Sequence, residues 1–395
     1  MRTSFYKEIE KDLDYLKAAG TYKKMHFLKS PVSNWTEVED HGKVLLLCSN
    51  NYLGLANNPE IIQAGMEALK KYGAGAASVR FICGTFDIHR TLEEKTAGFL
   101  GTEAALTYTS CWDANIAVLS TLLKDGDTII SDELNHASII DGCRLSGKEV
   151  KKLVYKHADL NSLEEKLKES KDSKIILVVT DGIFSMEGDI APLKDIVELC
   201  ERYNAMVMVD DSHAIGVIGK TGRGTAEYFD LIGKIDIITG TYGKALGGAG
   251  GGFIASKKSV IDLCIQKSRP HLFSNSLSPV LAGIAIAALE YLEDNPSIVQ
   301  SLHEKIKFFQ KSLQQIGLQV INGESAIIPI IIGDTTKAIR IAEKMFETGV
   351  YVIGFGYPIV PEGKARIRIQ ISDILTYDDL DYAVKIIEEI FKKYY

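Results

Sequence analysis

Short aliphatic and β-branched runs alternate with longer stretches of helical periodicity through the middle of the chain. The run Ile175–Val179 is apolar at every position, which is typical of a parallel strand covered on both faces. The stretch Asp159–Ser170 places three leucines on one helical face, and Asp159 can cap its first turn. This alternation predicts an α/β domain with a mostly parallel sheet. The predicted strands are Ala104–Thr109, Asp127–Ser131, Lys174–Thr180, Ala205–Asp210, Asp236–Gly240 and Gly252–Ser256.

The pattern changes after Leu277. Long helical patterns over 277–292 and 296–316 precede short strand patterns near 319–321, 326–332 and 365–371, with helices over 336–348 and 377–393. We therefore predict three parts: an N-terminal helix and strand (1–50), a large domain with the mostly parallel sheet (51–285) and a smaller C-terminal α+β domain (286–395).

Composition and charge narrow the class of protein. With 45 Lys and Arg against 52 Asp and Glu, the net charge is −7, and no basic block is present, so we expect no nucleic-acid partner. The longest apolar run, Val280–Leu289, is too short for a membrane span. The six cysteines lie far apart and the N-terminus lacks the apolar region of a signal peptide. We expect a cytoplasmic enzyme with free thiols, no membrane association and no metal.

Lys244 is the first candidate for chemistry. It follows the predicted strand Asp236–Gly240 and lies among hydroxyl residues and glycines, in a segment that leaves room for a flat ligand. A lysine in such surroundings can form a Schiff base with an aldehyde. The alternative is an ordinary loop lysine.

A second candidate lies at the end of the strand Ala205–Asp210. Asp210, Asp211 and His213 come together where open α/β sheets bind ligands. A buried carboxylate there needs a cationic partner, such as a protonated ring nitrogen. Metal binding by the three side chains and a capped strand end with solvated acids are the alternatives.

Two predicted helix starts and one strand offer weaker signals. The segment 107–115 opens a helix whose first amides can bind a phosphate, and Trp112 can stack on a ring. His136 also lies at a helix start, where a capping role is the plainer interpretation. In the alternating segment 365–372, Arg368 can bind a carboxylate with its planar fork, although ordinary surface strands alternate in the same way.

Taken together, these segments resemble the α-oxoamine synthases, a family of fold type I pyridoxal 5′-phosphate (PLP) enzymes, and most closely their glycine C-acetyltransferase branch. The stretch Ser78–Thr85, which reads SVRFICGT, discriminates best, because oxononanoate synthases typically carry a glycine- and serine-rich version there. The other segments that carry the resemblance are 48–55, 130–142, 181–186 and 268–276.

The resemblance implies a role for each catalytic residue. Lys244 is expected to form the Schiff base with PLP and then to act as acid and base, and Asp210 to pair with the pyridinium nitrogen. His136 is expected to stack on the ring. His213 and Ser185 are expected to hydrogen-bond around the phenolic oxygen and the substrate.

The same resemblance assigns the binding residues. The start of the helix at Ser110, Cys111 and Trp112, with the Thr241 hydroxyl, is expected to hold the phosphate. The substrate carboxylate is expected between two further side chains, and a Ser-Asn pair is expected to reach the cofactor of a second subunit, which implies a homodimer with shared sites. The carboxylate residues are Asn50 and Arg368, and the pair is Ser274 and Asn275.

The implied reaction condenses glycine with acetyl-CoA to give 2-amino-3-oxobutanoate and CoA. It is reversible, and the expected cellular direction cleaves the product of threonine oxidation, with functional coupling to a threonine dehydrogenase. The alternative is 8-amino-7-oxononanoate synthase activity, in which alanine and pimeloyl-CoA join with loss of carbon dioxide, or dual specificity. Trp112 stands where the family leads us to expect Phe or Tyr, which bears on the preferred acyl chain.

Overall fold

The computed structural model describes residues 2–320, 323–357 and 359–394. The chain divides into two compact units. One is the continuous segment Asn50–His303, and the other combines Met1–Ser49 with Glu304–Tyr395. These are units of packing, and the domain limits given above stay a prediction.

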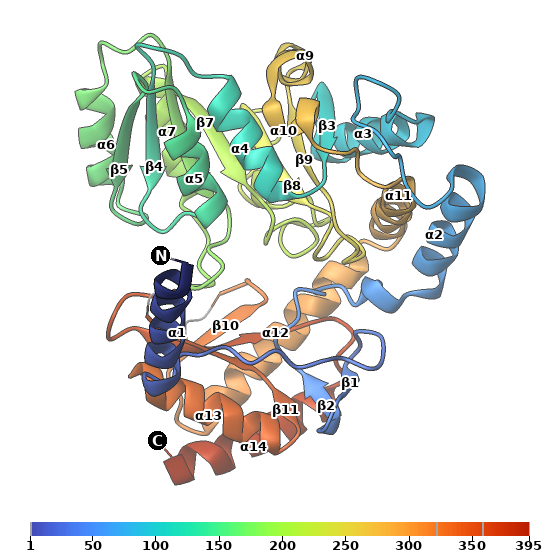
Figure 1. Cartoon of the computed structure of the whole chain (residues 1–395), viewed down its shortest axis with the longest axis vertical. Helices are drawn as coiled ribbons and strands as arrows, with labels where there is room; N and C mark the ends of the chain where they lie inside the picture. Colours follow the sequence, from blue (N-terminus) through green and yellow to red (C-terminus); the bar gives the residue numbers. More distant parts are fainter. Residues whose placement is uncertain (1, 321–322, 358, 395) are drawn as a thin grey trace. The chain divides into compact units, whose positions relative to one another are not determined.

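A seven-stranded sheet organises the unit Asn50–His303, with the strand order β3-β9-β8-β7-β6-β4-β5 (Figure 1). β9 pairs antiparallel with β3 and with β8, whereas all the other pairings are parallel. The predicted mostly parallel sheet is therefore confirmed. The strands are β3 (Ala104–Tyr108), β4 (Thr128–Asp132), β5 (Lys151–Tyr155), β6 (Ile176–Asp181), β7 (Met206–Asp210), β8 (Ile237–Thr241) and β9 (Gly252–Ser256).

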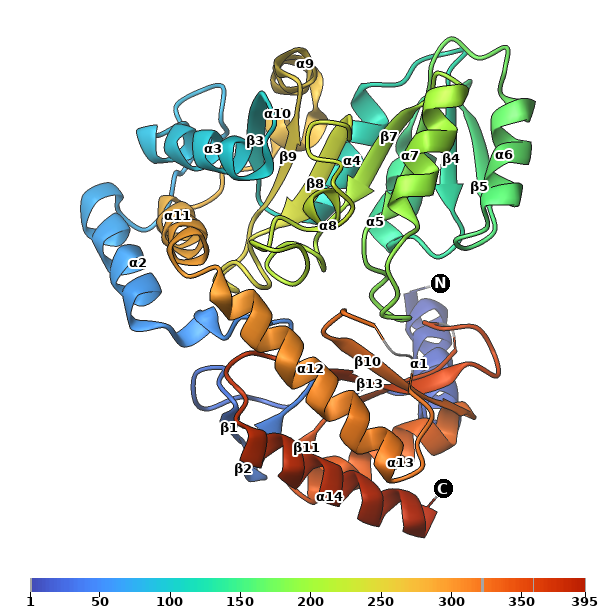
Figure 2. The ribbon, with the colours of Figure 1, turned by 180° about the vertical axis from the view of Figure 1, so that it is seen from behind.

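Helices cover both faces of this sheet. α4 and α5 lie on the face seen in Figure 1, and α6 and α7 lie on the face seen in Figure 2. Every residue of β6 is consequently buried, as its continuous apolar run predicts. The helices are η1 (Leu55–Asn57), α2 (Pro59–Tyr72), α3 (Asp87–Leu100), α4 (Cys111–Thr121), α5 (Ala137–Leu145), α6 (Leu160–Glu169), α7 (Leu193–Arg202), α8 (Thr225–Tyr228), α9 (Lys258–Lys267), α10 (Arg269–Phe273), α11 (Pro279–Asp294) and α12 (Ser297–Gln315), whose last residues belong to the other unit.

The parallel arrangement brings chemistry-bearing residues to one edge. Six of the seven strands run in the same direction, so their carboxyl ends share an edge of the sheet. Asp181 and Asp210 are register partners at the ends of β6 and β7, and β8 ends next to them at Thr241. Behind this edge lies a core that includes Val179, Met208 and other fully buried aliphatic side chains.

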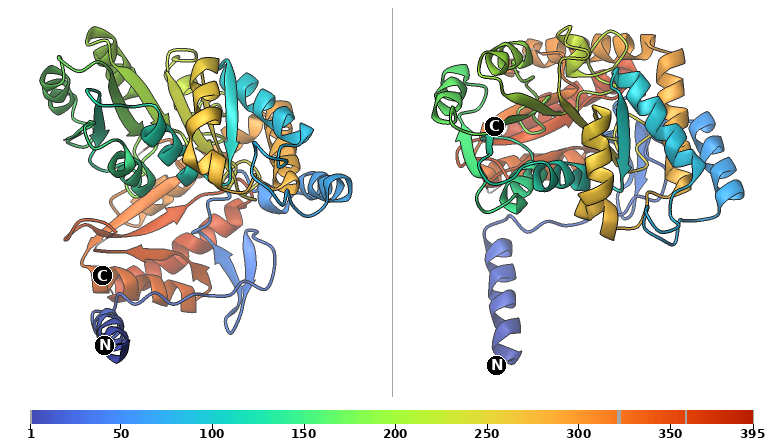
Figure 3. Two further views of the ribbon diagram at one scale, coloured as in Figure 1. Left: turned by 45° about the horizontal axis from the view of Figure 1, so that its top comes forward. Right: turned by 90° about the horizontal axis from the view of Figure 1, so that it is seen from above.

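The second unit contains two three-stranded sheets, β1-β2-β11 and β10-β13-β12. Figure 3 shows its strands beside α13 and α14, and α13 packs on β12 and β13. At the predicted strand 319–321, Gln319 and Val320 are irregular, and Ile321 lies outside the described residues. The elements are α1 (Arg2–Ala18), β1 (Trp35–Val38), β2 (Gly42–Leu46), β10 (Ile327–Gly333), α13 (Thr335–Glu347), β11 (Val350–Tyr351), β12 (Ile353–Phe355), β13 (Ala365–Gln370) and α14 (Tyr377–Tyr394).

No helix in the described part of the chain combines the length and the apolar character that a membrane crossing requires.

Candidate active site

A cavity of about 180 Å³ opens at the carboxyl edge of the seven-stranded sheet. Its lining comes from the ends of β6, β7 and β8 and from the segments that follow β3 and β4. Eight of the residues predicted from the sequence line it, within a single packing unit. The lining consists of Cys111, Trp112, His136, Ser138, Asp181, Ile183, Ser185, Asp210, Ser212, His213, Thr241 and Lys244.

Asp210 forms the floor of the cavity and is held by neutral donors. The Asn115 side-chain amide donates a 2.6 Å hydrogen bond to Oδ2, and the backbone N–H of Ser212 donates one of 2.9 Å to Oδ1. The Cys111 thiol lies 3.6 Å from Oδ2. Asn115 is itself oriented by the Thr239 hydroxyl, which donates to its Oδ1 at 2.7 Å. These bonds fix the carboxylate and add no positive charge to it.

His136 caps the start of α5 and connects to the same floor. Its Nδ1 lies 2.7 Å from the Ser138 hydroxyl, which accepts a 2.8 Å hydrogen bond from Asn115. Its backbone N–H donates to Asp181 at 3.0 Å. The imidazole ring also meets the half-exposed ring of Trp112 edge-on, at 5.8 Å between centroids. The ring is thus held in one orientation at the cavity wall.

Burial decides the charge state of His136. Burial lowers the pKa of His136, and nearby Lys244 lowers it further, whereas Asp210 acts in the opposite direction. A neutral imidazole results, which suits stacking on a flat ring. The capping interpretation and the stacking interpretation are therefore compatible, because the cap uses the backbone and Nδ1 while the ring face stays at the cavity.

Asp181 is a second buried carboxyl at the cavity, and no role was predicted for it from the sequence. Burial raises its pKa well above the usual range, and the neighbouring Asp210 raises it further. The two acids thus share the edge of adjacent strands, and the raised pKa favours the neutral form of Asp181.

Asp211 is directed away from the cavity. Its carboxylate accepts hydrogen bonds from the Thr225 backbone N–H at 2.9 Å and from the Thr225 hydroxyl at 2.7 Å. Burial raises the pKa of Asp211 to about 7. The alternative metal site needs Asp210, Asp211 and His213 around one point. No group of three or more potential ligands that could hold a metal ion exists among the residues the structure describes.

The start of α4 forms a cradle for an anion. Cys111 and Trp112 are the first residues of the helix and line the cavity, where the backbone N–H groups of a first turn have no partner within the helix. Ser110 caps the helix by accepting from the Asp113 N–H at 3.1 Å, so its own side chain serves the helix. A Cβ at Gly252 would lie 2.2 Å from the Cys111 nitrogen, so only glycine lets β9 approach this closely.

His213 is oriented from outside the cavity by Tyr52. The buried Tyr52 hydroxyl lies 2.8 Å from Nδ1 of His213 and donates to Oδ1 of Asn50 at 3.2 Å. Asn50 thus reaches the cavity wall through Tyr52, although it does not line the cavity itself. Tyr52 lies in the segment 48–55, which carries part of the resemblance, but no role was predicted for it.

Lys244 lies three residues beyond the end of β8, in the same cavity as Asp210. Thr241, the last residue of that strand, accepts from the Gly243 N–H at 3.0 Å and so shapes the connecting turn. The buried Ser212 hydroxyl lines the cavity and has no hydrogen-bond partner within the described residues. The cavity therefore fits a planar, anionic aldehyde, because an amine, a carboxylate, a flat imidazole and a helix start surround it.

The remaining predicted residues lie elsewhere in the chain. Ser274 follows the short helix α10, and Asn275 forms an isolated bridge with Val79; neither lines the cavity. Arg368 lies in the other packing unit, on β13. Its guanidinium donates to Gln370 Oε1 at 3.1 Å and lies 5.1 Å from the centre of the Phe355 ring. The roles assigned to these residues stay predictions.

Three residues of the network lie in segments described above, although no role was predicted for them. Asn115 lies one helical turn after Cys111, so both face the same side of α4. Asp181 ends the strand next to β7, just as Asp210 ends β7 itself. Ser138 lies two residues after His136, within reach of its ring. Only the pairing of strands and helices in space shows that they meet.

Comparison with known proteins decides the family. The sequence profile of the aminotransferase class I and II family matches residues 42–387. The chain belongs to this family. It is 45% identical over 395 residues to the 2-amino-3-ketobutyrate coenzyme A ligase of Escherichia coli K12, covering 100% of this chain and 99% of the relative. It is also 46% identical over 388 residues to the 8-amino-7-oxononanoate synthase of Thermosipho melanesiensis, covering 98% of each.

A solved member of the same fold shows the likeness in three dimensions. A high-resolution structure of serine palmitoyltransferase with a PLP internal aldimine superimposes with a TM-score of 0.93 at 28% identity, covering 99% of this chain and 98% of the other. The resemblance identified in the sequence and the predicted fold class are both confirmed.

Proposed function

We propose that this member of the aminotransferase class I and II family is a PLP-dependent acyltransferase, which condenses glycine with acetyl-CoA to give 2-amino-3-oxobutanoate and CoA. The observation that carries the proposal is that Lys244, Asp210 and His136 converge at one cavity. The first residues of α4 line the same cavity. The 45% identity to relatives named 2-amino-3-ketobutyrate coenzyme A ligase, in bacteria and mammals, supports this substrate pair.

When bound, PLP supplies an aldehyde that condenses with amines and a ring that withdraws electrons from a neighbouring carbanion. The amine of Lys244 is the group that holds the aldehyde. The Asp210 carboxylate, fixed by neutral donors, keeps the ring nitrogen protonated. The neutral imidazole of His136 covers one ring face, and the first amides of α4 with the Thr241 hydroxyl bind the phosphate.

Proton transfer belongs to Lys244 as well. With PLP bound, the Lys244 amine would take one proton from Cα of glycine, which then forms its bond to the acetyl carbon. The thiolate of CoA would leave that carbon and take up a proton to become the free thiol, so the step balances. His213, oriented by Tyr52, and Ser185 hydrogen-bond around the phenolic oxygen and the incoming carbonyl. Because Tyr52 holds Nδ1 of His213, we assign these hydrogen bonds of His213 to Nε2.

The substrate carboxylate is assigned to Arg368 and Asn50. A carboxylate held in the plane of the ring keeps its carbon–carbon bond out of alignment with the π-system, which suppresses decarboxylation. The Arg368→Ala variant should therefore lose affinity for glycine and release some decarboxylated aminoketone. Unchanged kinetics and an unchanged product ratio would refute this role.

The assembly and setting complete the proposal. Ser274 and Asn275 lie outside their own chain's cavity, which supports a role at the cavity of a second copy in a homodimer.

We assign the enzyme to the cytoplasm and to threonine breakdown, where it cleaves the product of threonine oxidation and is functionally coupled to a threonine dehydrogenase. The similarity to 2-amino-3-ketobutyrate coenzyme A ligases supports 2-amino-3-oxobutanoate as the compound that is cleaved.

The decisive assay compares two substrate pairs with the purified protein. Release of CoA from glycine and acetyl-CoA without carbon dioxide supports the proposal. The 46% identity to an oxononanoate synthase makes alanine with pimeloyl-CoA the second pair. If that pair reacts faster and releases carbon dioxide, the family stands and the substrate assignment is wrong.

A further inference from the structure

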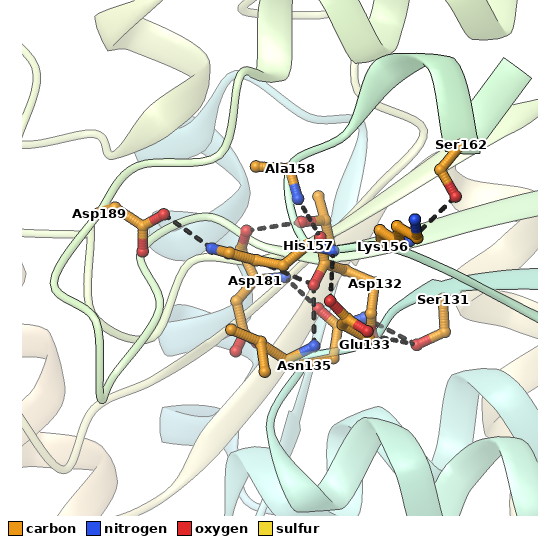
Figure 4. A network of polar contacts seen from close by, with 12 residues as sticks. Ser131, Asp132, Glu133, Asn135, Lys156, His157, Ala158, Ser162, Asp181 and Asp189 are labelled. Carbon is orange, nitrogen blue, oxygen red and sulfur yellow. Dashed lines mark hydrogen bonds and ion pairs between the residues drawn. The ribbon is translucent and has the colours of Figure 1, made fainter. Parts of the chain in front are cut away.

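His157 lies just outside the cavity and touches both loops that shape one of its walls (Figure 4). We propose that His157 is a positioning residue, whose imidazolium ties together the two loops that carry His136 and Ser185. The proposal deepens the proposed function, since it concerns the geometry of that same cavity. No motif in the sequence analysis includes His157.

Both ring nitrogens of His157 face carboxylates. Nδ1 lies 3.1 Å from Oδ1 of Asp132, and Nε2 lies 2.9 Å from Oδ2 of Asp189. A neutral imidazole has one donor and one acceptor, whereas an ionised carboxylate only accepts. Two carboxylates at hydrogen-bond distance on both nitrogens therefore require the doubly protonated, charged ring. The side chains of Asp132, His157 and Asp189 are 1%, 20% and 34% exposed, so Asp132 is the most deeply buried of the three.

Asp132 transmits this contact to the loop that carries His136. It ends β4 and accepts hydrogen bonds from the N–H groups of Leu134 and Ala158, each at 2.9 Å. Ala158 adopts a positive φ of 52°, which is costly for a residue with a Cβ and brings its N–H onto Asp132. The turn between Asp132 and His136 is thus fastened at its first residue.

Asn135 fastens the other end of this turn. Asn135 donates to the Val179 carbonyl at 2.8 Å and accepts from the Asp181 N–H at 2.8 Å. Asp181 in turn accepts from the His136 backbone N–H at 3.0 Å. A shift of Asp132 would therefore move the His136 backbone relative to β6.

Asp189 transmits the contact to the loop that carries Ser185. This loop folds back on itself, with a bridge between Ile183 and Ile190 and a 3.1 Å hydrogen bond from the Phe184 N–H to the Asp189 carbonyl. The Phe184 ring meets the His157 ring edge-on at 4.4 Å between centroids. His157 therefore fixes both the base of this loop and the residue that precedes Ser185.

The charge on His157 persists across the physiological range. Burial lowers its pKa, but the hydrogen bonds and charges of Asp132 and Asp189 outweigh burial and raise the pKa to about 10. The third carboxyl that faces the residue is Glu133, which accepts from the His157 backbone N–H at 2.9 Å. No cation faces the ring in these described contacts, so the local field is acidic.

The first test reads the ring directly. In the PLP-loaded enzyme labelled with nitrogen-15 histidine, the signals of His157 are assigned by their loss in His157→Gln. We expect imidazolium shifts for both ring nitrogens at pH 8. A neutral ring at that pH would overturn the proposal, whatever reaction the enzyme catalyses.

The second test separates positioning from general stability. Asp189→Asn keeps the size and an acceptor while it removes one charge, and Asp262→Asn is the matched control, since Asp262 pairs with Lys258 at 2.7 Å outside the cavity. We expect Asp189→Asn to lower kcat 10- to 100-fold and to move the alkaline limb of the pH profile down by at least one unit, with the control unchanged. Wild-type kcat and an unmoved limb in Asp189→Asn would overturn the positioning role.

These readouts distinguish two failures. If the wild-type protein releases no CoA from glycine and acetyl-CoA, the proposed function fails, and the nitrogen-15 spectrum still decides the state of His157. If the wild-type protein is active and the ring is neutral, the proposed function stands and the positioning role is wrong.

Discussion

Two polar networks lie at the same edge of the sheet and handle charge in opposite ways. In the floor network, the negative Asp210 receives hydrogen bonds from the Asn115 amide and the Ser212 backbone N–H, which are neutral. In the rim network, the two carboxylates of Asp132 and Asp189 bind a cation of the chain itself, His157. The hydrogen-bond donors that hold Asp210 are neutral, whereas the carboxylates of the rim are held by a cation.

The different ways in which the carboxylates are held indicate different roles: Asp210 binds a ligand, and Asp132 and Asp189 hold loops in place. A fixed carboxylate without a cationic donor is prepared to pair with a positive ligand atom, because partial desolvation makes such pairing favourable. An imidazolium between two carboxylates has no charge left to offer and serves to hold segments together. Accordingly, Asp210 lines the cavity, where a ligand can reach it, and His157 does not line it.

The largest effect is expected from Asp210→Asn, in the network at the floor of the cavity. The substitution removes the charge that pairs with the protonated ring, and loss of one partner of a buried ion pair costs about 3–5 kcal/mol. We expect the affinity for PLP or the rate to fall by about two to four orders of magnitude, measured by PLP titration and by CoA release. Asp211→Asn is the matched control: it is adjacent and buried, and its carboxylate binds Thr225. Equal losses in both variants would contradict the special role of Asp210.

The neutral donor is tested by Asn115→Leu. This change leaves Asp210 and Ser138 without the amide that joins them, at a cost of about 1–3 kcal/mol. We expect kcat/KM for glycine to fall about 10- to 100-fold. Asn295→Leu is the control, because that amide donates only to the Tyr291 carbonyl at an exposed helix end. A loss below twofold in Asn115→Leu would show that the floor does not depend on this bond.

The rim is tested by the pH dependence of stability. The pKa of His157 rises from about 6.5 in the unfolded chain to about 10 in the folded protein. Its stabilising contribution is therefore complete below pH 6.5 and is lost as the pH rises through 10. We expect His157→Gln to lower the free energy of unfolding by about 2 kcal/mol at pH 6, with a difference that shrinks toward pH 10, as measured by urea denaturation. A difference that grows with pH would contradict the charged rim.

The smallest effect is expected from Ser138→Ala. The hydroxyl joins Asn115 to Nδ1 of His136, and its loss removes about 1 kcal/mol of hydrogen bonding at a buried site. We expect a several-fold decrease in kcat and a decrease of about 1 kcal/mol in the free energy of unfolding. A wild-type kcat would show that the stacking of His136 needs no support from the floor.

Much of the large sheet is predictable because its strands bury apolar residues on both faces. All six predicted strands match observed strands within two residues at each end, and Gly252–Ser256 has the same bounds in both. β5 is missed since it lies at the sheet edge and reads Lys-Lys-Leu-Val-Tyr with exposed positions. β11 and β12 are missed because two or three residues leave no periodicity to detect.

The site is predictable where a residue type carries its own chemistry. Four residues are recognised by their type and by their position at or after the end of a strand: Lys244, Asp210, His136 and His213. Asn115 and His157 do not, because their roles depend on partners that are distant in sequence, such as Asp210 for Asn115 and Asp189 for His157. Such roles arise from packing, which no local pattern records.

The most direct test of the account is borohydride reduction of the PLP-loaded protein, followed by peptide mass spectrometry. We expect the pyridoxyl group on the peptide that contains Lys244, and we expect the Lys244→Ala variant to take up no label. A label on a different lysine, or a protein that binds no PLP, would contradict the assignment of the cavity as the catalytic centre.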